Sequence, residues 1–207
     1  MRLGLPFPTP ARRIAQLDEA LTIIRSLFTA ARTDFSGRYY RLASAPAEPK
    51  PLQTRLPILV GGSGKKMLRL AATHADIWHG YAPTTTDFGA LVRDFHAACA
   101  DVGRDPGTVA VAAGGQVIIR DSARGLEQRF DAHVARHHAP LGRPGELTGT
   151  VQHVASHIAE RLRAGLDLFI CTDQAPFDEE SMRRLATEAW PLALAMAGQP
   201  PAITRAR

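Results

Sequence analysis

The sequence predicts an α/β protein in which a parallel β-sheet is covered by α-helices. Short, wholly apolar runs alternate with longer stretches whose apolar residues recur at spacings of three and four, and this alternation is the basis of the prediction. The composition agrees, because 207 residues with 45% hydrophobic and 22% charged side chains are typical of a globular protein and exclude a disordered or fibrous one. A chain of this length buries a sizeable core, which favours one domain and also permits two small ones.

The N-terminal region begins with a predicted amphipathic helix. Thr9 is placed to be its N-cap and Pro10 its first residue, and apolar residues follow along one face at Ile14, Leu17, Leu21, Ile24 and Phe28. Residues 35–42 then predict a small hairpin that turns at Ser36-Gly37. The proline-rich residues 45–57 predict an extended connection to the next part of the chain.

From residue 58 onward, predicted strands alternate with predicted helices. The strands are residues 58–60, 76–79, 109–119 and 166–171, and Gly114-Gly115 interrupts the third of them. The helices are residues 65–73, 88–102, one that Asp121-Ser122 caps, 151–162 and 178–195, and residues 198–207 are a flexible tail. Because a complete eight-stranded barrel needs about 250 residues, the pattern predicts either a small open sheet or one half of a barrel.

Charge and cysteine content narrow the function classes. The net charge is +5, but Lys and Arg are scattered and aromatic residues make up only 6%, so no nucleic-acid interface is predicted. No apolar run reaches the ~18 residues of a membrane helix, and the N-terminus lacks the apolar core of a secretory signal. Cys99 and Cys171 each lie in an apolar pattern and are expected to be reduced packing residues. These features predict a cytoplasmic protein that does not contact membranes.

The strongest local motif is Gly61-Gly62-Ser63-Gly64, which follows a strand and precedes a helix that starts with Lys65. Glycines let a backbone approach a ligand closely, and a helix N-terminus carries partial positive charge, so this loop can cradle a phosphate. The motif is neither a P-loop nor a dinucleotide-binding fingerprint. A plain strand-to-helix turn therefore remains the equal alternative on these residues alone.

Histidines supply weaker candidates. His133 with His137, and His153 with His157, are spaced four residues apart on predicted helices, but no carboxylate pattern accompanies them. We interpret them as solvated helix faces and predict no metal site. His79 follows Trp78 at a strand end, where parallel α/β folds place ligand contacts, whereas core packing is the alternative for the tryptophan. No residue can be assigned as a catalytic acid, base or nucleophile.

An ordered set of segments resembles the bacterial luciferase-like monooxygenase family, and most closely its deazaflavin-dependent branch. The N-terminal segments are Gly4-Leu-Pro-Phe-Pro8, Leu17-Asp-Glu-Ala-Leu21, Phe35-Ser-Gly-Arg-Tyr-Tyr40, Pro49-Lys-Pro51 and Leu56-Pro-Ile-Leu-Val-Gly-Gly62. Later segments are Leu68-Arg-Leu-Ala-Ala-Thr-His-Ala-Asp-Ile-Trp78, Gly103-Arg-Asp-Pro106, Thr150-Val-Gln-His-Val-Ala155 and Glu160-Arg-Leu-Arg-Ala-Gly-Leu-Asp167. The resemblance covers nearly the whole chain.

The resemblance implies a partial TIM (β/α)8 barrel. Residues 1–197 would be its C-terminal half, with strands five to eight and a small hairpin insertion. The family binds FMN or coenzyme F420 at the C-terminal ends of its strands. By this resemblance Gly61, Gly62, Ser63 and Gly64 would contact the cofactor's phosphate. Lys65, in the first turn of the following helix, and His79, at a strand end, complete the predicted cofactor-binding residues. The implied function is an oxidoreductase or monooxygenase that uses reduced F420 or FMN on a small-molecule substrate.

The family's first four strands have no counterpart here. A fragment, a misassigned start site and a natural truncation are all compatible with this, so whether the chain is active by itself stays open. The alternative function is a non-catalytic half-barrel binding or assembly module. In either case the inward strand faces, including Ile58, Val60, Ile77 and Phe169, are expected to lack an opposing layer. We therefore predict that the chain forms a homo-oligomer or pairs with a complementary half barrel.

Overall fold

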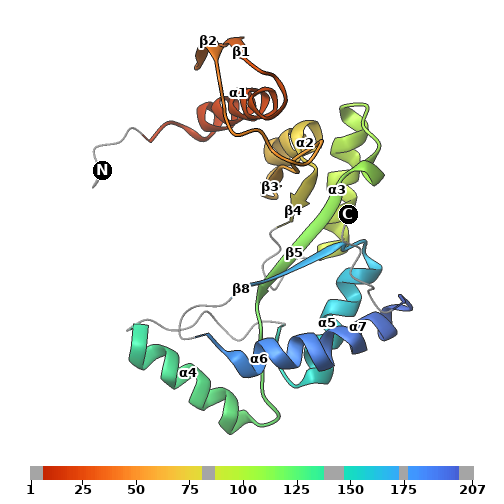
Figure 1. Ribbon diagram of the computed structural model, residues 1–207. Coiled ribbons are helices and arrows are strands. Elements are labelled where there is room, and N and C mark those ends of the chain that lie inside the picture. The colour runs from red at the N-terminus through yellow and green to blue at the C-terminus, as the bar shows by residue number, and fades with distance from the viewer. Residues whose placement is uncertain (1–6, 81–86, 138–146, 173–176, 201–207) are drawn as a thin grey trace. The chain divides into compact units, whose positions relative to one another are not determined.

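A computed structural model describes residues 7–80, 87–137, 147–172 and 177–200. These residues form two compact units (Figure 1). Unit 1 draws on residues 1–79 and 94–109, and unit 2 on residues 80–93 and 110–207. Helix α3 (Phe88–Asp101) begins in unit 2 and ends in unit 1. Each unit combines helices with parallel strands, so the α/β prediction is confirmed.

Unit 1 contains two strand pairs and the helices that cover them. Its elements are α1 (Pro10–Thr29), β1 (Thr33–Ser36), β2 (Arg41–Ala45), β3 (Leu59–Gly61), α2 (Lys65–His74), β4 (Ile77–His79) and the 3-10 helix η1 (Pro106–Thr108). Strands β1 and β2 form the expected antiparallel hairpin, although its turn lies at residues 37–40 instead of 36–37. Strands β3 and β4 are parallel, with Val60 opposite Trp78 and Gly61 opposite His79.

Two carboxylates fasten the parts of unit 1 together. Glu19 of α1 accepts hydrogen bonds from the backbone N–H groups of Arg38, Tyr39 and Tyr40, at 2.8 to 3.0 Å, and so attaches the hairpin turn to this helix. Asp76, just before β4, accepts from the backbone N–H of Ile58 at 2.8 Å and from Arg25 and Arg55. Burial opposes ionisation of Asp76, but these donors outweigh it and hold the pKa of the carboxyl below its ordinary value.

The core of unit 1 lies between the β3–β4 pair and helices α2 and α3. Trp78 and Phe95 are both completely buried, and their rings stack with centroids 4.3 Å apart and planes inclined by 13°. Val60, Leu68 and Cys99 are buried as well. Alternate residues of a strand point to opposite faces, so Val60 and Trp78 face the helices while Leu59, Ile77 and His79 share the other face.

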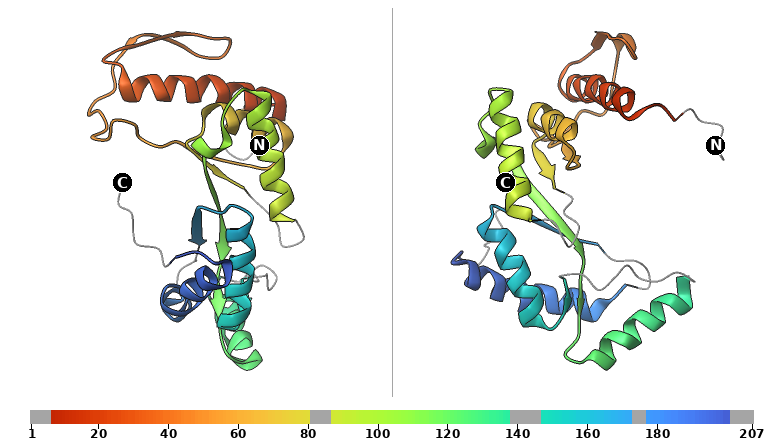
Figure 2. Two further views of the ribbon diagram at one scale, coloured as in Figure 1. Left: turned by 90° about the vertical axis from the view of Figure 1, so that its right-hand side faces the viewer. Right: turned by 180° about the vertical axis from the view of Figure 1, so that it is seen from behind.

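Unit 2 pairs β5 (Ala110–Gln116) with β8 (Leu168–Thr172) in parallel, and β6 (Ile118–Ile119) with β7 (Thr148–Gly149) in parallel. Its helices are α4 (Ala123–His137), α5 (Val151–Arg163), α6 (Glu179–Arg184) and α7 (Trp190–Ala197), and a π-helical turn (Leu185–Ala189) joins the last two. Helices α5 and α7 lie side by side (Figure 2). The single strand predicted for residues 109–119 is thus divided at Val117, and β7 was not predicted.

Close strand contact explains one of the two glycines that interrupt the predicted third strand. An alanine methyl group at Gly114 would lie 1.9 Å from the carbonyl oxygen of Ile170 in β8, which is closer than any real side chain approaches a backbone atom. Only a hydrogen atom fits between these two strands. At position 115 the same methyl group would come no nearer than 3.5 Å, to Leu147.

The prediction that four strand residues are uncovered is wrong for Ile58 and Val60, whereas Ile77 and Phe169 are each half-buried. Ile58 and Val60 are only 9% and 5% exposed, and Phe169 is half-buried with its ring 6.0 Å from that of Trp190. The apolar residues that stand out are Leu59, 46% exposed, and Leu168, 41% exposed. The prediction assigned the wrong face of the strand to the helix layer. Successive side chains of a strand point to opposite faces, so an error of one residue exchanges the covered face and the uncovered face.

The expectation that both cysteines are packing residues holds for one of them. Cys99 is buried as expected, whereas Cys171 is exposed, because it lies near the end of β8 where the helix layer does not cover it. Among the described ranges, every helix is too short or too polar to cross a lipid bilayer.

Candidate functional site

The Gly61–Gly64 loop connects the end of β3 to the start of α2, all within unit 1. Gly61 is the last residue of β3, Gly64 is the N-cap of α2 and Lys65 is its first residue. Gly64 and Lys65 are exposed, and Ser63 is half-buried. Parallel α/β folds bind ligands at the C-terminal ends of their strands, and this loop lies at such an end.

Gly62 adopts a conformation that favours glycine. Its φ angle is +135°, and a methyl group added there would lie 3.3 Å from Cβ of Met67. Both of its backbone polar groups are engaged: the N–H donates to the carbonyl oxygen of His79 at 3.1 Å, and the carbonyl oxygen accepts from Nε1 of Trp78 at 2.9 Å. The N–H of Gly62 is therefore already used in a backbone hydrogen bond between β3 and β4. The donors for a ligand come from the residues that follow Gly62.

The N-terminus of α2 carries no side-chain cap. The N–H groups of Met67 and Leu68 bond to the carbonyl oxygen of Gly64, at 2.7 and 2.9 Å. The first two residues of an α-helix have no carbonyl partner within the helix, so the N–H groups of Lys65 and Lys66 are the donors that this end offers to an anion. A methyl group at Gly64 would meet no atom within 4 Å, so the space beside the N-cap is open.

A cavity of about 680 Å³ borders this loop. From α2 the lining includes the cationic side chains of Lys65, Lys66 and Arg69, and from α3 it includes Asp94 and Asp101. Within the described part of the chain, none of these three cations has an ion-pair partner. Lys66 lies in the first turn of α2, where the sequence places it beside Lys65, whereas Arg69 was not predicted. The position of Arg69 one turn further along α2 was the signal that would have found it.

His79 lies directly opposite Gly61 in the β3–β4 register. A methyl group at Gly61 would lie in van der Waals contact with His79, 3.9 Å from its Cβ atom. Because Gly61 has no side chain, this flank of His79 is not covered by residue 61. The imidazole is half-buried and lies on the face of β4 that α2 and α3 do not cover. The structure thus brings His79 next to the loop, as neighbours on adjacent strands.

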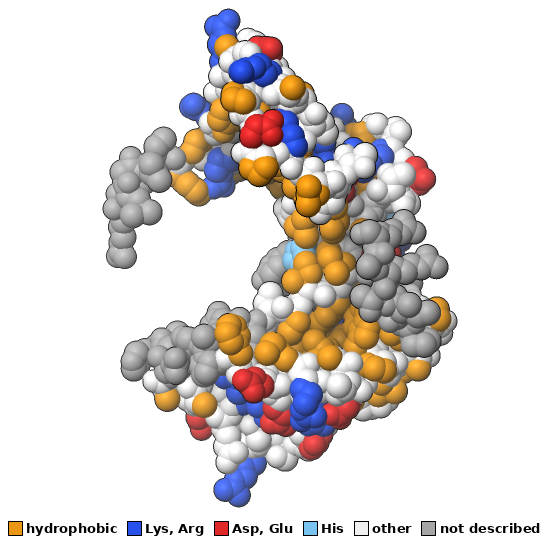
Figure 3. All heavy atoms as spheres, viewed as in Figure 1, with side chains coloured by type: hydrophobic (Ala, Val, Ile, Leu, Met, Phe, Trp, Pro, Cys, Tyr) orange, Lys and Arg blue, Asp and Glu red, His pale blue; other side chains and the backbone are white. Residues whose placement is uncertain are grey.

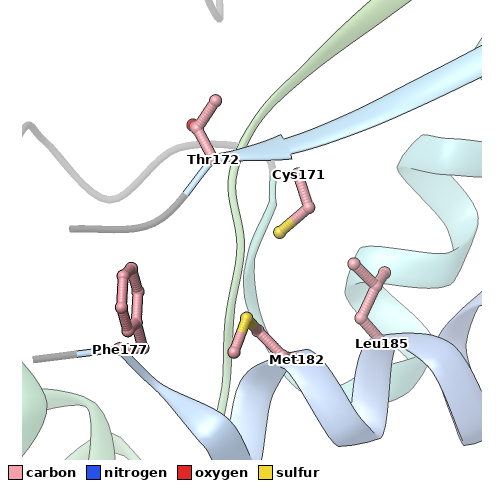
Figure 4. Close-up of a pocket in the computed structure, with 5 residues that line it drawn as sticks. All are labelled: Cys171, Thr172, Phe177, Met182 and Leu185. Atoms are coloured by element: carbon pink, nitrogen blue, oxygen red, sulfur yellow. The ribbon is translucent and has the colours of Figure 1, made fainter. Parts of the chain in front are cut away.

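A second cavity, of about 500 Å³, lies in unit 2 between β8 and α6. In Figure 4 the side chains of Cys171, Met182 and Leu185 point toward one another, Phe177 lies across from them and Thr172 points away. Figure 3 shows apolar side chains gathered on the same face of this unit. None of the five lining residues is charged. This cavity was not predicted from the sequence, because the apolar pattern around Cys171 indicates a packing residue.

The expectation of solvated helix faces is wrong for one described histidine and agrees with the exposure of another. His133 is buried, 3% exposed, so the expectation is wrong for this residue, since its side of α4 is packed. His153 is exposed and its ring lies 4.7 Å from that of His157, edge to face. The side chain of His137 lies outside the described residues. In the part of the chain that the structure describes, no three metal-ligating side chains come together.

Comparison with known proteins adds family information to this geometry. The sequence profile of the family described as luciferase-like monooxygenase matches residues 2–200. An F420-dependent glucose-6-phosphate dehydrogenase from Nakamurella multipartita is 36% identical over 92 residues, which are 44% of this chain and 26% of that protein. A phthiodiolone/phenolphthiodiolone dimycocerosates ketoreductase from Mycobacterium kansasii is 30% identical over 150 residues, which are 70% of this chain and 40% of that protein.

Solved structures share the fold at low sequence identity. An F420-dependent tetrahydromethanopterin reductase from Methanopyrus kandleri has a TM-score of 0.69 and 20% identity, covering 92% of this chain and 70% of that one. A long-chain alkane monooxygenase has a TM-score of 0.70 and 15% identity, covering 97% of this chain and 60% of that one. The chain thus spans about three fifths of this monooxygenase and less than half of either curated relative.

Proposed function

Because the chain belongs to the luciferase-like monooxygenase family, we propose that it acts as an oxidoreductase whose residues 61–65 bind the phosphate of FMN or F420. The observation that carries this proposal is the loop itself. A glycine-rich segment ends a parallel strand and leads into a helix that no side chain caps, with Lys65 exposed beside it.

The donors present fit a phosphate group. Backbone N–H groups of Lys65 and Lys66, the ammonium group of Lys65 and the hydroxyl group of Ser63 are all of the types that bind phosphate oxygens. The missing side chain at Gly64 leaves open space in which an oxygen can approach the backbone. His79, the neighbour of Gly61, is proposed to contact the same cofactor from β4.

A bound, reduced cofactor would supply the chemistry, either hydride transfer or oxygen activation. The residues of this chain would bind and orient it, and the substrate would be a small molecule. We favour F420 over FMN, because relatives 36% and 37% identical over part of this chain are named F420-dependent. The same comparisons favour an oxidoreductase over a non-catalytic module.

Cofactor titration of the loop variants tests the proposal. Ser63→Ala removes a hydrogen bond to a charged group, which is worth about 1.5–3 kcal/mol, so the affinity for FMN or F420 should fall about tenfold to a hundredfold. Gly62→Val should abolish binding, because φ is +135° and Met67 is close. Thr73→Ala, an exposed hydroxyl on the same helix, is the matched control and should change nothing. Equal affinities for the wild-type chain and Ser63→Ala would contradict the proposed site.

A further inference from the structure

Trp78 connects the hydrophobic core of unit 1 to the candidate phosphate loop. Its side chain is completely buried, with the indole stacked on Phe95. A buried tryptophan usually finds a partner for its one N–H group, and here that partner is the carbonyl oxygen of Gly62, 2.9 Å from Nε1. The side chain therefore has a packing contact on one side and a directional bond to the loop on the other.

The bond to Gly62 determines which way the next N–H group points. The structure has its only cis peptide bond, among the described residues, at Glu48-Pro49, so the peptide between Gly62 and Ser63 is trans. In a planar trans peptide the C=O and the following N–H point in opposite directions. Since the Gly62 carbonyl oxygen points at the buried indole, the N–H of Ser63 points away from it.

The other side of Gly62 is held as well. Its N–H donates to the carbonyl oxygen of His79, so two consecutive residues of β4 fix the two polar groups of this one loop residue. Glycine at φ +135° would otherwise have wide conformational freedom. Strand β4 thus sets the conformation of the loop at its second residue.

We propose that Trp78 is a positioning residue for the phosphate site: its Nε1–H fixes the Gly62–Ser63 peptide so that the loop presents its donors to the phosphate. This inference rests on the proposed function of the loop. A residue with a packing role alone would change stability when replaced, and it would affect phosphate-bearing and phosphate-free ligands equally. A positioning residue changes the preference between them.

Two variants separate the packing contact from the hydrogen bond. Trp78→Phe keeps an aromatic ring against Phe95 and removes the N–H group, whereas Phe95→Leu removes the stacking and keeps the bond. The probes are two pairs: FMN with riboflavin, which differ only in the phosphate group, and F420 with its deazaflavin precursor, which lacks the phosphate together with the tail attached to it. Affinities are measured by fluorescence titration of the purified chain, and folding is checked by circular dichroism.

The wild-type chain is expected to bind the phosphate-bearing member of a pair more tightly. Loss of one neutral hydrogen bond should reduce this preference about twofold to tenfold in Trp78→Phe. Phe95→Leu should unfold more easily and keep the wild-type preference. An unchanged preference in Trp78→Phe would overturn the positioning role and leave the proposed function standing. A wild-type chain with no preference in either pair would overturn the proposed function, and the role of Trp78 with it.

Nuclear magnetic resonance gives an independent readout. The chain has two tryptophans, so Trp190→Phe assigns the indole N–H resonance of Trp78. Addition of FMN or F420 should shift this resonance, because the indole bonds to the loop that contacts the phosphate. The phosphate-free partners should shift it much less. Equal shifts with both members of a pair would contradict the inference.

Discussion

Asp178 joins three elements of unit 2 through buried charges. It is the N-cap of α6, and its carboxylate accepts hydrogen bonds from the backbone N–H of Ser181 at 3.1 Å and from the hydroxyl of Ser181 at 2.8 Å. It also accepts from Arg120, which follows β6, at 2.9 Å, and from Arg129 of α4 at 3.1 Å. The side chains of Asp178 and Arg129 are 4% and 8% exposed.

Replacing Asp178 with asparagine removes the charge and keeps the shape. Two arginines would then face an amide in a buried site. Breaking a buried ion pair by removing one partner costs about 3–5 kcal/mol, and since the asparagine oxygen still accepts a hydrogen bond, we expect about 3 kcal/mol for Asp178→Asn. At ~2–4 °C per kcal/mol for a chain of this size, the melting temperature should fall by roughly 6–12 °C.

Urea denaturation followed by circular dichroism measures this change. The matched control is Asp121→Asn, which removes a single carboxylate–arginine bond to Arg184 at an aspartate whose side chain is 75% exposed, and its loss should be far smaller. Loss of less than about 1 kcal/mol in Asp178→Asn, or equal losses in both variants, would refute the reasoning that burial makes this carboxylate costly to remove.

The same carboxylate predicts a pH dependence. Burial tends to raise the pKa of Asp178, but the hydrogen bonds from Arg120 and Ser181 outweigh it and hold the pKa below its ordinary value. A lowered folded-state pKa contributes stability that is complete above the unfolded-state value, about 3.9, and disappears as the pH falls through the folded value. The stability difference between wild type and Asp178→Asn should therefore be constant from about pH 5 to about pH 8 and shrink below about pH 4.

Two further predictions concern the surface. In the folded chain a thiol reagent should modify one cysteine, Cys171, because Cys99 is completely buried and burial raises the pKa of its thiol; Cys171→Ser should abolish the reaction, and two rapidly modified thiols would contradict the structure. The chain should self-associate at low micromolar concentration through its exposed strand residues, and Leu59→Lys with Leu168→Lys should raise the monomer fraction in light scattering. A compact wild-type monomer would rule out this association.

Local sequence determined the elements of this protein. Apolar spacing and capping residues depend on neighbours within a turn or two, so the helix that Thr150 caps and the glycine loop after β3 were predicted close to their observed positions. The alternation of apolar runs and amphipathic stretches was sufficient to predict the α/β class. The ordered set of segments between Gly4 and Asp167 was sufficient to identify the family.

Tertiary structure decided which face of each strand is covered and which groups of the loop are engaged. A three-residue strand such as β3 has too short a pattern to show which of its faces meets the helices, and Leu59 is accordingly exposed where Val60 is buried. The bond from Trp78 to Gly62 joins residues 16 positions apart, and the bond from Arg120 to Asp178 joins residues 58 apart. Such contacts depend on how the elements pack in three dimensions, which no local pattern specifies.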